Sequence, residues 1–145
     1  MNITTEIVWT KIQIALTAIG GVLGYFLGGL DGLMITLLVF IIIDYITGIF
    51  CAIQDKKLSS AVGFKGIAKK VLILLLVGMS NILDIHVIKS GSAARSAVTM
   101  FYLSNEGLSI LENSAHLGLP VPEALKEILE QLHKREKKST ETNNE

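Results

Sequence analysis

The stretch Leu33–Ile53, LMITLLVFIIIDYITGIFCAI, decides how this chain folds. It holds twenty-one residues and only one formal charge, at Asp44 near its middle. An α-helix rises about 1.5 Å per residue, so the stretch reaches about 30 Å, the thickness of the hydrocarbon layer of a bilayer. The stretch therefore predicts a membrane-spanning helix. An ionisable group at that depth is costly, so Asp44 must face protein or water, or be protonated.

Composition places the whole chain in the same class. Its mean hydropathy is +0.55 and 18% of its 145 residues are charged, which is too apolar for an ordinary soluble domain of this length. Charges are segregated: between Ile12 and Gln54 only Asp31 and Asp44 are charged. The lone Cys51 excludes a disulfide within the chain, and no cleavable signal peptide is expected at the N-terminus. We expect a small, all-α integral membrane protein.

Two further segments are apolar and long enough to span a membrane, at about residues 12–30 and 67–88. The first carries Gly20, Gly24 and Gly28 at four-residue steps on one helical face. Small residues at this spacing let helices approach closely in lipid, which favours self-association or packing against the next span. The alternative is that glycine is simply frequent in such helices. Asp31-Gly32 then predicts a tight turn into the span at 33–54.

A basic stretch separates the second and third spans, and we expect it to stay in the cytoplasm. This places the N-terminus inside and the turn at Asp31 outside. A solvated connector is favoured over a specific site for anionic lipid, which is the alternative. The lysines of this stretch are Lys56, Lys57, Lys65, Lys69 and Lys70.

The segment 93–116 is amphipathic, because polar residues recur at helical steps along it. Such a helix lies on the membrane, packs against the other spans or lines an aqueous path in an oligomer. We expect a membrane domain over 1–116 and a cytoplasmic C-terminal helix with a charged tail over 117–145. The residues of the polar face, as candidates for pairing or for lining a pore, are Arg95, Asn105, Glu106, Ser109, Glu112 and Asn113.

Catalytic chemistry has little support in this sequence. No glycine-rich phosphate loop occurs, no histidine pair has metal-ligand spacing, and Cys51 has no histidine near it in the chain. We therefore expect no enzyme activity, no cofactor and no metal. The sites of interest are polar groups in apolar surroundings, which in membranes form pairs or line pores.

Four such groups are candidates for intramembrane assembly: Asp44, Tyr45, Thr47 and Asp84. Asp44 either makes a hydrogen bond, for example with Tyr45 or Thr47 of a neighbouring chain, or controls assembly through its protonation. Arg95 either pairs with Glu106 or Glu112 or lies at the membrane interface. The sequence leaves both choices open.

Short motifs in a fixed order make the chain resemble the toxin-secretion and phage-lysis holins, small membrane proteins of phages and prophages of Gram-positive bacteria. The resemblance covers about 9–132. Its motifs are DYITG at 44–48, LSS at 58–60 with Gly63 and Gly66, LD at 83–84, Arg95, FYLSNE at 101–106, LSILEN at 108–113 and GLPVP at 118–122.

The resemblance implies a protein that accumulates in the host cytoplasmic membrane and then oligomerises into lesions that release an endolysin or a toxin. Its partners would be other copies of itself, membrane lipids, an endolysin that need not touch it and, in some systems, an antiholin. No nucleic-acid partner is expected. The alternatives are a small ion or solute channel regulated through Asp44, and an antiholin or scaffold that restrains another holin.

Overall fold

A computed structural model describes residues 3–89, 91–128 and 130–131 of the chain. Every regular element within those residues is helical, so the all-α prediction is confirmed. Short helical stretches also occur at 123–128 and 130–131, and the rest of the predicted charged tail lies outside the described residues. The elements are α1 (Ile3–Leu27), α2 (Gly32–Gln54), α3 (Ser60–Leu83), a π-helical turn η1 (Asp84–Ile88) and α4 (Ala93–His116).

Three segments have the length and hydropathy of membrane spans, as predicted: Thr5–Leu27, Gly32–Gln54 and Ser60–Ile88. The first begins before the predicted residue 12 and ends before the predicted residue 30, because Gly28 and Gly29 adopt left-handed conformations that end α1. The third begins seven residues before the predicted 67, because Ser59 caps its helix: Ser59 Oγ accepts a hydrogen bond from the Val62 N–H at 3.2 Å. The connector between α2 and α3 is therefore short, and Lys65, Lys69 and Lys70 lie on α3. Asp31 caps α2 in the same way, accepting from the Met34 N–H at 2.8 Å.

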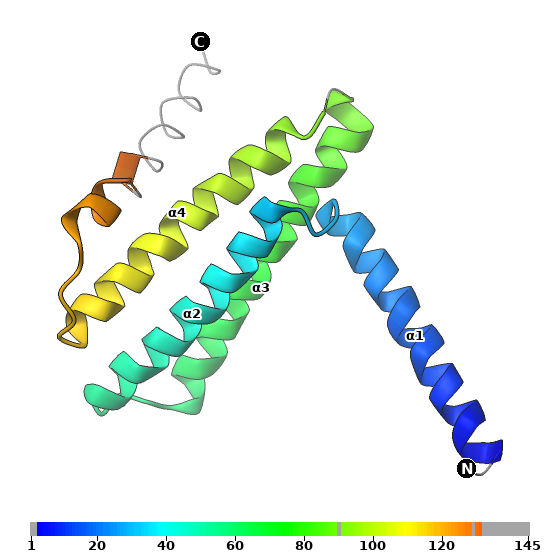
Figure 1. The fold of residues 1–145 in the computed structure, drawn as a ribbon, viewed down its shortest axis with the longest axis horizontal. Helices are drawn as coiled ribbons and strands as arrows, with labels where there is room; N and C mark the ends of the chain where they lie inside the picture. Colours follow the sequence, from blue (N-terminus) through cyan, green and yellow to red (C-terminus); the bar gives the residue numbers. More distant parts are fainter. Residues whose placement is uncertain (1–2, 90, 129, 132–145) are drawn as a thin grey trace.

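Helices α2, α3 and α4 pack side by side, with α3 antiparallel to the other two (Figure 1). Their small apolar core consists of Met34, Leu37, Ile41, Ile73, Val77 and Leu103. Most other large apolar side chains face outward, as they must when the surrounding solvent is lipid. Helix α4 keeps the predicted limits 93–116. It lies along α2, with Arg95 beside the start of α2 and His116 beside its end.

Helix α1 diverges from this three-helix bundle and contacts it only near its own C-terminal end (Figure 1). There Phe26 packs against Gly78 of α3, and the Asn81 side chain donates to the Tyr25 and Phe26 carbonyls at 3.0 and 3.1 Å. Among the described residues, no part of α1 packs against α2.

The three glycines of the first span do not share one role. A Cβ at Gly20 or Gly24 would meet nothing within 4 Å, so these residues do not pack α1 against α2. Gly28 follows the last residue of α1 and has φ +79, a left-handed conformation in which glycine is favoured. Self-association through Gly20 and Gly24 stays a prediction.

The contact between Phe26 and Gly78 predicts a position-specific effect of adding one methyl group. Gly78→Ala is expected to lower stability by about 1–3 kcal/mol, because the new Cβ would overlap the Phe26 ring and push α1 away from α3. Thermal unfolding of the purified protein in detergent measures the effect. Gly20→Ala is the matched control and should melt like the unchanged protein; equal melting temperatures for both variants would contradict the contact.

Candidate functional site

One charged side chain from each helix of the bundle meets the others in the apolar interior. Lys70 of α3 donates to Asp44 Oδ2 of α2 and to Glu106 Oε2 of α4. Their side chains are only 11%, 12% and 3% exposed, so the three charges are removed from both lipid and water. We call these three residues the lysine cluster.

Asn113 and Thr47 complete the bonding of Asp44. The Asn113 amide donates to Asp44 Oδ1 at 3.1 Å and to Thr47 Oγ1 at 3.0 Å, and the Thr47 hydroxyl donates to the Asp44 carbonyl at 3.1 Å. One turn further along α2, the Cys51 thiol lies 3.5 Å from the Asn113 carbonyl. Asp44 therefore has hydrogen-bond partners within its own chain, and a hydrogen bond to Tyr45 or Thr47 of a neighbouring chain stays a prediction.

The position of the lysine cluster gives it a structural role. Asp44 lies ten residues before the end of α2, about 15 Å along the helix, which is near the middle of a span. Lipid offers no hydrogen bonds, so each charge depends on the other two. Such a cluster fixes how three helices sit against one another, because sliding any helix by one turn would leave a charge without a partner.

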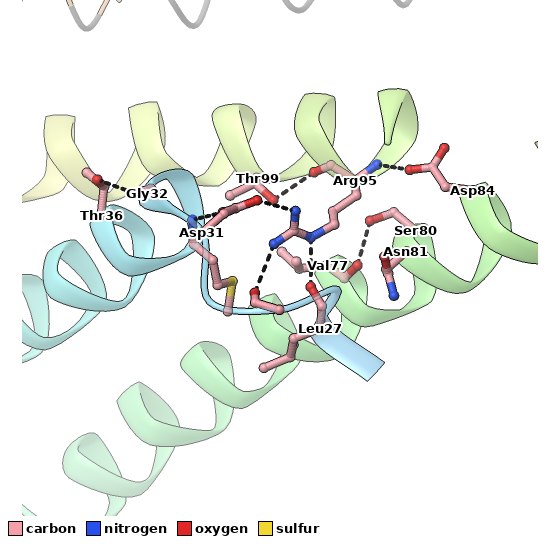
Figure 2. A network of polar contacts seen from close by, with 12 residues as sticks. Leu27, Asp31, Gly32, Thr36, Val77, Ser80, Asn81, Asp84, Arg95 and Thr99 are labelled. Carbon is pink, nitrogen blue, oxygen red and sulfur yellow. Dashed lines mark hydrogen bonds and ion pairs between the residues drawn. The ribbon is translucent and has the colours of Figure 1, made fainter. Parts of the chain in front are cut away.

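Arg95 forms a second cluster at one end of the bundle, where the turn between α1 and α2 meets the start of α4 (Figure 2). Its guanidinium donates to Asp31 Oδ2 at 2.6 Å, to the Leu27 carbonyl at 2.7 Å and to the Gly29 carbonyl at 3.1 Å. The end of a helix leaves carbonyls without intrahelical partners, and Arg95 satisfies one of them, at Leu27, together with the Gly29 carbonyl of the turn that follows. We call Arg95, Asp31 and Asp84 the arginine cluster.

Asp84 holds the start of α4. Its two carboxylate oxygens accept from the Ala94 N–H at 3.0 Å and from the Arg95 N–H at 2.7 Å. Figure 2 shows the second of these bonds. A carboxylate at a helix N-terminus satisfies free N–H groups and interacts favourably with the helix dipole. Arg95 does not pair with Glu106 or Glu112, as the sequence allowed, because those residues lie about three to five turns away on the same helix.

Two hydrogen bonds lower the pKa of the Asp31 carboxyl from its ordinary value of 3.8. The bond from Arg95 has the larger effect and the bond from the Met34 N–H the smaller one. A carboxyl whose pKa is lowered by folding contributes stability that is complete above the ordinary pKa and is lost as pH falls through the lowered one. The Asp31 side chain is half exposed, so the contribution is at most about 1 kcal/mol.

We therefore expect the melting temperatures of the unchanged protein and of Asp31→Asn to differ at pH 7 and to converge below about pH 4. Thermal unfolding in detergent from pH 7 to pH 3 measures the difference. A difference that stayed constant over that range would contradict the ion pair with Arg95.

The opposite end of the bundle is closed by contacts between α4 and the end of α2. His116 Nε2 lies 2.9 Å from Asp55 Oδ1, and the Gln54 side chain donates to the His116 carbonyl at 3.4 Å. The hydrogen bond with His116 lowers the pKa of the Asp55 carboxyl. Lys56 and Lys57 lie beside this contact in the exposed connector, as predicted for a basic loop.

The remaining predicted residues divide between the interior and the surface. Tyr45 packs on Gly66 of α3, where an added Cβ would lie 3.1 Å from the ring. Asn105 and Ser109 are half-buried and Glu112 is exposed, and their side chains make no hydrogen bond or ion pair within the described part of the chain. Lys65 and Lys69 are also exposed, whereas Lys70 is buried in the lysine cluster.

The role of Lys70 differs from its sequence-based assignment to a basic loop, and the sequence held a signal for it. Asp44 stands eleven residues before Asp55, and Lys70 stands eleven residues after Ser59. In a hairpin of two antiparallel helices, residues equally far from the connector lie at the same level. Asn81 and the contact of Phe26 with Gly78 had no comparable signal, because α1 meets α3 across a long separation in sequence.

The described part of the chain has three helices that can span a membrane and a fourth, α4, that packs along α2 and α3 and is joined to them by buried ion pairs. These features define a small multi-pass protein of the cytoplasmic membrane. Residues 21–134 match the bacteriophage holin family, and the chain belongs to that family. The predicted resemblance to holins is therefore confirmed.

Relatives occur in bacteria and in a phage. An uncharacterized protein of Listeria innocua is 42% identical over 118 residues, 81% of this chain and 84% of the relative. An uncharacterized 14.9 kDa protein of Clostridium perfringens is 40% identical over 92% of this chain and 98% of its own length. A probable holin of Bacillus phage phi105 is 34% identical over 72% and 77% of the two chains. No solved structure matches this chain.

Proposed function

We propose that this chain acts as a holin: it accumulates in the cytoplasmic membrane, oligomerises and opens lesions through which an endolysin or a toxin leaves the cytoplasm. The match to the bacteriophage holin family over most of the chain carries the proposal. The protein would act without catalysis, by displacing lipid. Its partners would be other copies of the same chain, with the released enzyme as a passive cargo.

The arrangement of α4 supports four crossings of the membrane. Helix α4 contacts the first residues of α2 through Arg95 and the last residues through His116, so it runs the full length of a helix that spans. Its 24 residues reach about 36 Å. With the basic connector at 55–59 in the cytoplasm, both ends of the chain then lie inside.

The buried clusters suit a protein that must accumulate before it acts. In the isolated bundle the charges of Asp44, Lys70 and Glu106 contact one another, so a single copy exposes none of them to lipid. In a water-filled lesion the same side chains would be solvated. The bundle therefore supports a harmless monomeric state and permits an open assembled one.

Inducible expression of the chain in a bacterium, with and without a cytoplasmic endolysin that lacks a signal peptide, tests the proposal through culture density. We expect sudden clearing only when both proteins are present. Growth arrest with the endolysin retained would indicate a small channel instead. Undisturbed growth, together with delayed lysis when a known holin is added, would indicate an antiholin.

A further inference from the structure

The outer face of α4 presents polar side chains with no partner in the described chain. Asn105 and Ser109 are half-buried, Glu112 is exposed, and none of the three side chains makes a hydrogen bond or ion pair there. The bonded groups Arg95, Glu106 and Asn113 lie about a quarter turn round the helix from this strip. A polar strip that faces lipid is stabilised when a protein partner supplies hydrogen bonds to it, because lipid tails offer none.

Helix α3 carries the opposite charge on its own outer face. Lys65 and Lys69 are one turn apart, both are exposed, and neither forms a close ion pair in the described chain, although Lys69 lies near enough to Glu106 to interact with it electrostatically. Their neighbour Lys70 turns inward to the lysine cluster. A hollow of about 180 Å³ between α2 and α3 is lined by Lys69 but not by Lys65, and it also reaches Asp44 and Lys70 of the lysine cluster.

The ion pair between Lys70 and Glu106 sets the relative level of these two faces. Helices α3 and α4 are antiparallel. Residue numbers therefore increase toward the cytoplasmic end along α4 and decrease toward it along α3. Glu112 lies six residues beyond Glu106, about 9 Å, and Lys65 lies five residues before Lys70, about 8 Å. Lys69 lies at the level of residue 107, between Asn105 and Ser109.

We propose that the α4 face of one copy, formed by Asn105, Ser109 and Glu112, binds the α3 face of the next copy, formed by Lys65 and Lys69. Copies inserted with one topology differ by rotation about the membrane normal, so equivalent residues share one depth. Glu112 then meets Lys65 at the same level, and Lys69 meets the Asn105 and Ser109 side chains. Opposite charges in contact give an interface its register and its choice of partner.

The same charges disfavour a symmetric dimer. A two-fold axis along the membrane normal would place Glu112 against Glu112, or Lys65 against Lys65, and like charges repel. A contact between two different faces leaves one free face of each kind on every assembly, so it extends into a ring or an open array. This inference rests on the proposed function, since it describes how the lesion would be assembled.

Disulfide crosslinking in membranes tests the interface. In a Cys51→Ala background, differently tagged Lys65→Cys and Glu112→Cys chains are expressed together and oxidised with a membrane-permeant catalyst. We expect the mixed dimer to exceed both like-with-like dimers. A chain that carries both substitutions should give a ladder of oligomers. Phe64→Cys, at nearly the same level but turned about 100° away on α3, is the matched control: a chain that carries Phe64→Cys with Glu112→Cys should give no ladder.

Absence of the mixed dimer, in membranes where both chains accumulate, would overturn the interface, and so would an excess of the Glu112→Cys homodimer. Charge reversal gives a second measurement, and because both side chains are exposed these variants should fold normally. Lys65→Glu alone or Glu112→Lys alone should abolish the oligomers that are trapped by a crosslinker that does not react with amines. The two substitutions together should restore those oligomers. Culture lysis with endolysin is scored separately. Lysis without the mixed dimer would reject only the interface, and the mixed dimer without lysis would reject only the proposed function.

Discussion

Lys70→Met is expected to destabilise the bundle by about 3–5 kcal/mol, the largest effect of any single substitution considered. The change removes the only cation that contacts Asp44 and Glu106 in the described structure and leaves two carboxyl groups facing each other in an apolar interior. Breaking a buried pair by removing one partner carries this cost because an uncompensated charge stays behind. Thermal unfolding in detergent, or resistance to protease, measures the loss.

Two variants separate the ion pair from the bulk of the side chain. Lys69→Met changes the adjacent, exposed lysine of the same helix and should leave the melting temperature of the monomer in detergent unchanged. The triple change Asp44→Asn, Lys70→Met and Glu106→Gln removes all three charges together and should recover most of the stability, as replacement of whole buried ion clusters often does. If Lys70→Met melted like Lys69→Met, the lysine cluster would be excluded as a structural element.

Arg95→Met is expected to cost about 2–3 kcal/mol and to release α1 from the bundle. The substitution leaves the Leu27 and Gly29 carbonyls and the Asp31 carboxylate without their donor. An unpaired buried acceptor costs about 1–3 kcal/mol, and the half-exposed Asp31 recovers part of its loss from water.

Arg95→Lys distinguishes hydrogen bonding from charge alone. The lysine ammonium keeps the positive charge. It cannot donate, as the planar guanidinium of Arg95 does, to the end of α1 and to the turn at the same time, so this variant should recover only part of the stability. Protease cleavage between α1 and α2, at the turn around residues 28–31, reports the release. Cleavage rates equal in all three proteins would contradict the arginine cluster.

The helices could be predicted from the sequence because their cause is local. Apolar length gave the three spans, and periodic polarity gave α4 with the limits that the structure has. The beginning of α3 was placed seven residues late, because its first two turns carry Lys65 and several small residues and are less apolar than the rest. The Ser59 cap, not hydropathy, decides where that helix begins.

The partners of the buried charges depend on how the helices are placed in space, and periodicity along one helix carries no such information. Asp44, Asp84, Arg95 and Glu106 were recognised as polar groups in costly surroundings. Their pairing needed the level of each helix relative to the others, which the hairpin between α2 and α3 gives only for Asp44 and Lys70. Asp84 acting on the N-terminus of α4, ten residues away across a turn, needed the structure.

Release of a cytoplasmic fluorescent protein from single protoplasts that express this chain tests the holin proposal most directly, with a potential-sensitive dye recorded in the same cells. The account predicts an abrupt event in which the membrane potential collapses and the protein escapes within the same short interval, after a period without leakage. A gradual loss of potential with the fluorescent protein retained would contradict it, because that result requires a path for ions that is too narrow for a folded protein.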